Sequence, residues 1–182
     1  MRLATRFGWP TGRAIGAFVT LVVLSQAGCR RALPAIEIDE EENAGVASSI
    51  DGGDERAASQ FVSGFHDVEA SSYRWTMGKF SVVLQPPPSP GGAKLVLRFY
   101  LPEPVIARRK AVTLSASVEG LGLPPERYTA AGDYTYARDI PASSLPDRPV
   151  KIDFSLDRYL AAGEIELREL GITVMRVALA AK

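Results

Sequence analysis

The chain has 182 residues and balances 21 basic against 21 acidic side chains, with one cysteine and one histidine. This length predicts a single domain behind a short targeting segment. The neutral balance argues against a nucleic-acid-binding protein, since the one basic cluster, residues 108–110, suits an exposed turn. One histidine and one cysteine supply neither a metal-ligand set nor a nucleophile with its base. We therefore expect no cofactor, no metal and no catalytic residues.

The amino-terminal segment has the features of an export signal. Residues 1–31 hold five arginines and no acidic residue, so the remainder has five more acidic than basic side chains. An apolar run at residues 14–24 follows three of these arginines and ends in small residues. It is shorter than the roughly 20 residues that a bilayer-spanning helix needs. The pattern predicts a cleaved export signal over residues 1–28.

The segment Gln26-Ala-Gly-Cys29 resembles the lipobox of bacterial lipoproteins. The resemblance implies that Cys29 is diacylglycerylated, becomes the new amino terminus and anchors the protein to a membrane of the bacterial cell envelope. A lone thiol in an exported chain has no intramolecular disulfide partner, which agrees with this modification. Ser25-Gln-Ala27 also fits ordinary signal cleavage, which would give a soluble periplasmic or secreted protein. An uncleaved anchor or a cytoplasmic protein is the third alternative.

Residues 29–58 have the composition of a disordered tether. Between positions 36 and 58 there are eight acidic side chains against Arg56, mixed with glycine, serine and alanine and without any aromatic residue. Such a stretch buries too little apolar surface to offset the entropy of ordering it. Its contiguous acids lack the alternating spacing and fixed glycine of a calcium loop. We expect an acidic tether that holds a folded domain, residues 59–182, away from a membrane surface.

From residue 60 onward, apolar and polar side chains alternate with a period of two, which is typical of strands with one buried face. Proline and glycine clusters at residues 86–92, 102–104 and 123–125 separate these stretches and predict loops. The clearest strands are expected at residues 80–84, 95–101, 112–118 and 150–156, and weaker ones at residues 73–76, 127–137 and 172–179. At most one or two helical turns are expected, within residues 157–169.

These about seven short strands predict an all-β domain. The recurrent turn signals and the alternation favour a two-sheet antiparallel sandwich, of immunoglobulin-like or jelly-roll type, over an α/β enzyme fold. The apolar face of each strand would then form the core, and the other face would lie in water.

A cluster of aromatic and charged residues opens the folded domain. Trp75 is the one tryptophan outside the export segment, and large aromatics at the start of a strand are usually part of the core. Its neighbour Arg74 would need a carboxylate, because an unpaired buried guanidinium is costly. Glu69 is the nearest candidate, so we expect a structural ion pair between Glu69 and Arg74. Further on, Gly171 indicates a turn or a close approach of two backbones before the last strand.

Two of these segments together resemble a known group of modules. Gly64, an acidic residue and Arg74-Trp75 open the first strand, and Arg168-Glu-Leu-Gly-Ile-Thr-Val174 enters the last. This arrangement, over roughly residues 60–180, is similar to small β-sandwich modules encoded beside or fused to bacterial glycosyltransferases and envelope proteins. The late segment departs from their commoner aspartate-x-arginine version by inserting residues 161–165. The resemblance implies a non-catalytic accessory domain associated with carbohydrate and supplies no catalytic residues.

Three functions are compatible with these features. The first is an envelope-tethered, non-catalytic module that binds a glycan or a protein partner, with Tyr128, Tyr134 and Tyr136 as candidate ligand contacts because aromatic faces stack on sugar rings. The alternative to ligand contact, which we favour, is that these tyrosines pack against a sheet. The second function is a structural or assembly lipoprotein that docks a partner and has no glycan ligand. A hydrolase is the least favoured, because no nucleophile, base or metal set is evident.

Overall fold

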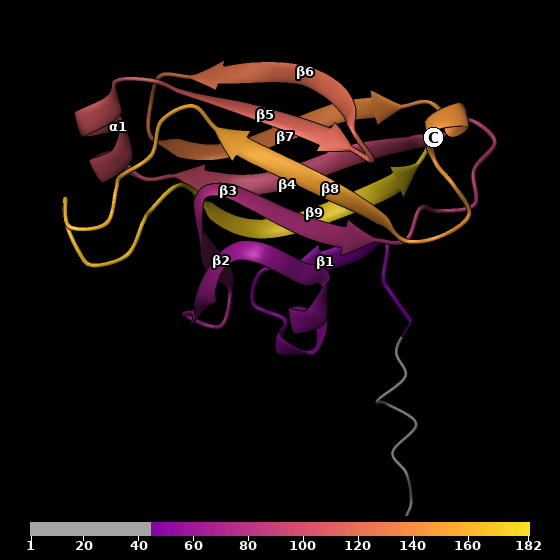
Figure 1. Cartoon of the computed structure of the whole chain (residues 1–182), viewed down its shortest axis with the longest axis horizontal. Helices are drawn as coiled ribbons and strands as arrows, with labels where there is room; N and C mark the ends of the chain where they lie inside the picture. The colour runs from indigo at the N-terminus through magenta and orange to yellow at the C-terminus, as the bar shows by residue number, and fades with distance from the viewer. Residues whose placement is uncertain (1–44) are drawn as a thin grey trace, which may run out of the picture. The chain divides into compact units, whose positions relative to one another are not determined.

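The computed structural model describes residues 45–182, so the predicted export signal, Cys29 and the acidic residues before Gly45 lie outside the described residues. Within this range the chain is mostly β-structure, and every strand pairing is antiparallel (Figure 1). This confirms the all-β prediction. No helix of residues 45–182 has the length and apolar character needed to cross a bilayer. The strands are β1 Ser49–Asp51, β2 Phe61–Glu69, β3 Tyr73–Leu84, β4 Ala93–Leu101, β5 Val112–Val118, β6 Leu121–Tyr128, β7 Gly132–Ile140, β8 Val150–Leu156 and β9 Thr173–Ala181; the helices are η2 Glu55–Gln60, α1 Glu103–Arg109 and η3 Ala142–Ser144.

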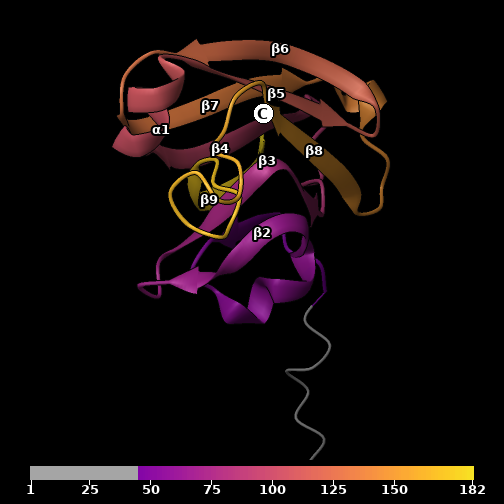
Figure 2. The same cartoon turned by 60° about the vertical axis from the view of Figure 1, so that its left-hand side comes forward.

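The hydrogen bonds join the strands into one continuous path. Its order is β6-β5-β8-β3-β9-β4-β7, with β1 added to β9 and β2 added to β3. In the view of Figure 1, β5, β6 and β7 lie toward the top and β1 and β2 toward the bottom. The described residues therefore hold nine strands, not the expected seven or so, in one curved sheet and not in two separate ones. The turned view of Figure 2 shows how β6 and β7, the two ends of the path, come close together.

Side chains close the seam between β6 and β7, where no backbone ladder forms. The Tyr136 hydroxyl donates to the Pro124 carbonyl oxygen at 2.9 Å, and Arg138 Nε donates to the same oxygen at 2.8 Å. Arg138 Nη2 also donates to Glu126 Oε2 at 2.8 Å. The prediction of a loop at residues 123–125 is wrong, because these prolines lie within β6. An edge strand tolerates them, since the N–H that each proline lacks is not needed for a ladder on that side.

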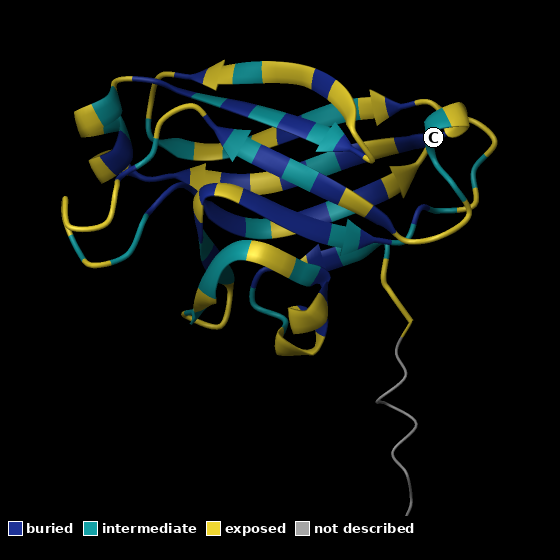
Figure 3. Cartoon of the chain, viewed as in Figure 1, coloured by how far each residue is buried: buried dark blue, intermediate teal, exposed yellow. Residues whose placement is uncertain are grey.

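The core follows the predicted alternation (Figure 3). In β4, β5 and β8 every second residue is buried, and these buried faces meet inside the curved sheet. Phe80 of β3 and Phe154 of β8 stack with ring centroids 4.9 Å apart, because the two residues are directly opposite in the ladder. Both side chains are 2 % exposed. Burial of this apolar surface is the main stabilising term for the domain.

Strand β3 pairs with both β8 and β9 and is longer than predicted. Its 12 residues unite the expected strands at residues 73–76 and 80–84. The second half pairs with β8, whereas Arg74 and Trp75 in the first half pair with Val174 and Thr173 of β9. The strand thus changes partners half-way along its length, which places its first three residues beside the beginning of β9.

Two local predictions need correction. The segment 157–169 contains no helix; it is a loop held at its base by an isolated bridge between Leu160 and Leu170. A helix forms instead at α1, where residues 102–104 were expected to be a loop. Pro104 lies in the first turn of α1, where its missing N–H leaves no intrahelical hydrogen bond unmade.

The predicted tether does not extend to residue 58. Ser49–Asp51 form β1 on the edge of β9, and Ile50 is 2 % exposed in the core. The Gln60 side chain fixes the same region by donating to the Ala47 and Val83 carbonyl oxygens. A single apolar residue in an acidic stretch is enough to dock it here, because the β9 edge supplies the backbone hydrogen bonds.

Candidate ligand-binding site

The three tyrosines predicted as ligand contacts face the interior. Tyr136 is 0 % exposed and Tyr128 is 4 % exposed. Tyr134 is partly buried, packs on Tyr128 with ring centroids 4.6 Å apart, and donates its hydroxyl to the Ala130 carbonyl oxygen. The cause is the register of the ladder: Tyr134 and Tyr136 lie opposite Phe99 and Leu97, whose side chains point into the core. The prediction is therefore wrong for Tyr128 and Tyr136, and packing against the sheet, the alternative that we favoured, describes them.

The predicted ion pair between Glu69 and Arg74 does not form. In the β2–β3 ladder Glu69 is opposite Tyr73, whereas Arg74 is opposite Val68. Directly opposite residues share one face of a sheet, so Glu69 and Arg74 point to different faces. The Arg74 guanidinium lies 4.8 Å from the centroid of the Phe61 ring and donates to the His66 carbonyl oxygen at 3.4 Å. A cation–π contact thus takes the place of the expected carboxylate.

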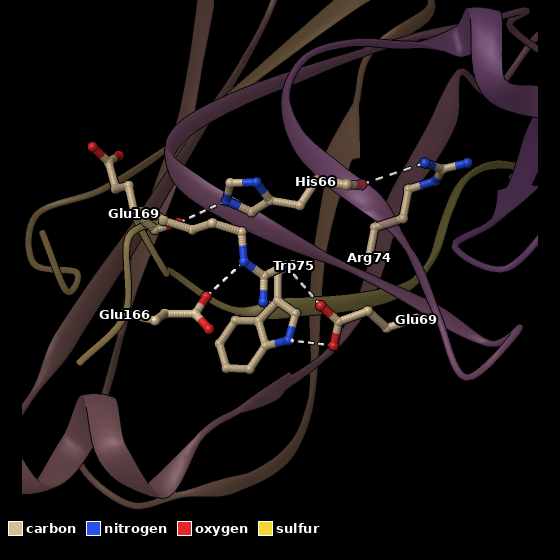
Figure 4. A network of polar contacts seen from close by, with 7 residues as sticks. His66, Glu69, Arg74, Trp75, Glu166 and Glu169 are labelled. Atoms are coloured by element: carbon tan, nitrogen blue, oxygen red, sulfur yellow. Dashed lines mark hydrogen bonds and ion pairs between the residues drawn. The ribbon is translucent and has the colours of Figure 1, made fainter. Parts of the chain in front are cut away.

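Glu69 instead takes part in a network with Trp75 and the loop before β9 (Figure 4). Trp75 Nε1 donates to Glu69 Oε2 at 3.2 Å, and Arg168 Nη1 donates to Glu69 Oε1 at 2.7 Å. Arg168 Nε donates to Glu166 Oε1 at 2.6 Å. Figure 4 shows Trp75 between Glu69 and Glu166, with Arg74 directed away from them. Because Glu166 and Glu69 bond it, the pKa of the Arg168 guanidinium is raised above its usual value, so this group stays charged.

Three further contacts fix the same loop to β2 and β3. Glu169 Oε1 accepts a hydrogen bond from the Gly78 backbone N–H. His66 Nε2 lies 2.7 Å from the Glu169 carbonyl oxygen, and since a carbonyl oxygen accepts only, this nitrogen carries the proton. Gly171 donates its N–H to the Thr76 carbonyl oxygen. A Cβ atom on Gly171 would lie 2.9 Å from the Met77 backbone carbonyl oxygen, which confirms the predicted close approach of two backbones.

The network borders a shallow, apolar slot of about 250 Å³ that is open to solvent. Thr173 of β9 is opposite Trp75 of β3 on one side and opposite Tyr100 of β4 on the other. The small Thr173 side chain therefore forms the floor between two aromatic walls. The full lining is Tyr73, Trp75, Tyr100, Pro102, Thr173 and Met175. The volume is below the roughly 300–1,000 Å³ of sites for drug-sized molecules, so the slot suits one small ring.

The prediction that Trp75 belongs to the core is right in part, because Trp75 is partly buried and packs against the core, but it also lines the slot. The sequence prediction did not include Tyr100, although the alternation along the strands carries a signal for both residues. Phe80, Val82 and Leu84 point inward on β3. Because side chains alternate between the two faces of an unbroken strand, the odd-numbered Trp75 lies on the face opposite to these three residues, the outer face. The same rule on β4, where Leu97, Phe99 and Leu101 are buried, places Tyr100 outside, and this residue is 38 % exposed.

The part of the chain that the structure describes contains no cluster of three or more histidine, cysteine, aspartate or glutamate side chains placed to hold a metal ion. His66 is bonded to a backbone carbonyl oxygen, and Glu69 and Glu166 share one guanidinium. What fold and site define together is a small antiparallel β-domain with an aromatic slot on its outer face.

No protein-family model and no curated protein matches the chain. Among solved structures it is similar to a family GH115 4-O-methyl-α-glucuronidase with specificity for decorated arabinogalactans, at 9 % identity and a TM-score of 0.45, over 76 % of this chain and 18 % of that one. It is also similar to an exo-β-1,3-galactanase from Phanerochaete chrysosporium, at 10 % identity and a TM-score of 0.39, over 74 % and 29 % of the two chains. A third is the CBM36-1 domain of a xylanase from the hindgut metagenome of Trinervitermes trinervoides, at 10 % identity and a TM-score of 0.36, over 67 % and 92 %. The chain thus spans less than a third of the length of the first two proteins.

Proposed function

We propose that this chain is a non-catalytic carbohydrate-binding β-module whose aromatic slot holds one sugar ring. The observation that carries the proposal is the row formed by Trp75, Thr173 and Tyr100 on three adjacent strands. A pyranose ring has a face of C–H groups and an edge of hydroxyls. Two aromatic walls match the face, and the neighbouring carboxylate and phenol groups match the hydroxyls.

The slot is well prepared for such a ligand. The hydrogen bond from Trp75 Nε1 to Glu69 fixes the indole ring, and Arg168 fixes the Glu69 carboxylate in turn. A ring that is already held in place loses little conformational freedom on binding, which favours affinity. The site lies on three strands of the sheet and not on a loop, and such rigid support keeps the distance between the aromatic walls constant.

The role of the two carboxylates supports binding over hydrolysis. A glycoside hydrolase uses one carboxylic acid as proton donor and a second carboxylate as nucleophile or base. Glu69 and Glu166 are both bonded to Arg168, and Glu69 also accepts from Trp75. Their contacts suit them to positioning Trp75 and the loop.

We also propose that the module acts in the bacterial cell envelope, anchored through a lipid on Cys29. Support comes from the sequence alone, namely the arginines, the apolar run and the segment Gln26-Ala-Gly-Cys29. A binding module on a lipid anchor would concentrate its ligand at a membrane surface.

A second candidate function, a structural or assembly lipoprotein that docks a protein partner, has one observation in its favour. Leu167 is 93 % exposed and Ile165 is 47 % exposed, both on the loop that carries Arg168. Exposed apolar side chains at a loop tip are a common feature of protein contacts.

Glycan-array screening of the full chain, followed by calorimetric titration, tests the first function. Trp75→Ala and Tyr100→Ala are each expected to weaken glycan binding about tenfold, the effect of losing ~1.4 kcal/mol of aromatic contact. Tyr134→Phe is the control, because Tyr134 is an aromatic residue outside the slot. Unchanged affinity in both slot variants would refute the slot. No glycan binding together with partner binding that is lost in Leu167→Ser would support the second function.

A further inference from the structure

We infer that the slot selects a sugar that carries an anionic group, a carboxylate in the first instance, and that Arg98 and Arg176 bind this group. The inference rests on the proposed function and narrows its ligand class. It starts from the two exposed arginines that adjoin the aromatic row on the same face of the sheet.

Strand positions place the arginines next to the slot. Arg98 precedes Tyr100 by two residues on β4, so both side chains are on the outer face, with Cα atoms roughly 7 Å apart. Arg176 of β9 is directly opposite Arg98. The outer face thus has one row with Trp75, Thr173 and Tyr100, and next to it the pair of arginines.

A β-bulge in β9 is what brings Arg176 to this face. Thr173 and Arg176 are three residues apart, and in a regular strand they would point to opposite faces. The register shifts here, however: Arg98 is opposite Arg176, whereas the next residue, Phe99, is opposite Val174. Met175 is the extra residue. Bulges of this kind re-aim side chains and are frequent beside functional sites.

Two arginines that face each other in a ladder repel one another, and an anion between them would relieve the repulsion. Arg98 has no ion-pair partner among residues 45–182. Arg176 donates Nε to Ser49 Oγ at 3.0 Å, and its Nη1 lies 3.8 Å from Asp51 Oδ1. That contact is too long for a hydrogen bond, so the Arg176 Nη atoms retain donors for a ligand.

The other charges near the slot lie at its edges. Asp133 of β7 is opposite Tyr100, and Thr135 is opposite Arg98. Glu69 lies on the far side of Trp75 and is neutralised by Arg168. A sugar ring on the aromatic row would therefore have one end near the arginine pair. A guanidinium fork matches a carboxylate, and such charge-assisted hydrogen bonds are about twice as strong as neutral ones.

A matched pair of ligands tests the inference. The full chain is titrated with an oligosaccharide that carries glucuronic acid and with the same oligosaccharide after reduction of its carboxyl groups to hydroxymethyl groups. The acidic form is expected to bind about tenfold more tightly at low salt, and the difference should shrink as salt is added. A sulfated form of an oligosaccharide without carboxyl groups shows whether another anionic group can replace the carboxylate.

Substitution of each arginine tests whether that residue causes the difference in affinity between the two ligands. Arg98→Gln and Arg176→Gln are each expected to remove most of the advantage of the acidic form and to leave binding of the reduced form unchanged. Arg127→Gln is the control, since Arg127 is an exposed arginine on β6 without an ion pair in the described part of the chain. Equal affinity for the two ligand forms, or an advantage that survives both variants, would overturn the inference and leave the proposed function intact. Absence of binding by either form would overturn both.

Discussion

The ion pairs of Arg168 make a sharp test of how the site is held together. Arg168→Gln removes the guanidinium that joins Glu69 to Glu166. The Arg168 and Glu69 side chains are 39 % and 35 % exposed, and Glu166 is 39 % exposed, so solvent screens both pairs. Exposed pairs of this kind contribute ~0.2–1 kcal/mol each. We expect the free energy of unfolding to fall by about 1 kcal/mol, because both contacts are lost and two carboxylates are left as neighbours.

A double-mutant cycle with Glu69→Gln isolates the pair between Glu69 and Arg168. The coupling energy is expected to be about 0.5 kcal/mol, and it should decrease in high salt. Urea-induced unfolding followed by circular dichroism measures each variant. Arg168→Lys serves as control, since it keeps the charge but loses the fork that reaches both carboxylates. If the two single changes add to the double change within ~0.2 kcal/mol, and Arg168→Gln leaves glycan affinity as it was, Arg168 does not position the slot and the reasoning is refuted.

Three further predictions concern the seam, the buried tyrosines and the amino-terminal segment. Arg138→Ala should lower the free energy of unfolding by about 2 kcal/mol, because its bonds to Pro124 and Glu126 close the gap between β6 and β7, and urea unfolding against Arg127→Ala measures this loss. Burial raises the pKa of the Tyr128 and Tyr136 hydroxyls above the ordinary 10.0, so the folded state holds these protons more tightly than the unfolded state. The contribution of these two groups to stability is therefore fully present below pH 10 and is lost as the pH rises above it. A spectrophotometric titration should show phenolate formation at these two residues only when the chain unfolds. Normal titration of all six tyrosines in the folded chain would contradict this prediction. Cys29→Ser should abolish incorporation of labelled fatty acid in a bacterial host, whereas equal labelling of both forms would exclude the lipid anchor on Cys29.

The strands were predictable where the alternation of apolar and polar residues alone identifies them. Val112–Val118 and Val150–Leu156 alternate strictly, and both form strands with the expected buried faces. The prediction was wrong where pairing with another strand determines the local structure. Ile50 has no periodic neighbours, yet it is ordered because β9 offers an unpaired edge next to it. The prolines of β6 likewise signal a loop, but they are compatible with a strand that pairs on one side only.

The charged contacts of the site were harder to predict than the strands. Glu69 and Arg74 are five positions apart, and nearness in sequence made them appear to be partners. The actual partner, Arg168, is 99 residues away and reaches Glu69 only because the loop before β9 returns to β3. A local rule does not contain this information, since it depends on the pairing of the first half of β3 with β9.

The location of the slot follows from the alternation of inward and outward side chains along β3. Its second half must bury Phe80, Val82 and Leu84 against β8, which commits even-numbered positions to the interior. Trp75 is thereby placed outside, where an indole is costly to leave in water unless something covers it. Glu69 accepts from the indole N–H, and Trp75 is partly buried, packs against the core and lines the open slot. A ligand in the slot would therefore contact Trp75. Removing Trp75 should therefore affect binding more than stability, and a large loss of stability with unchanged glycan binding would identify it as a packing residue.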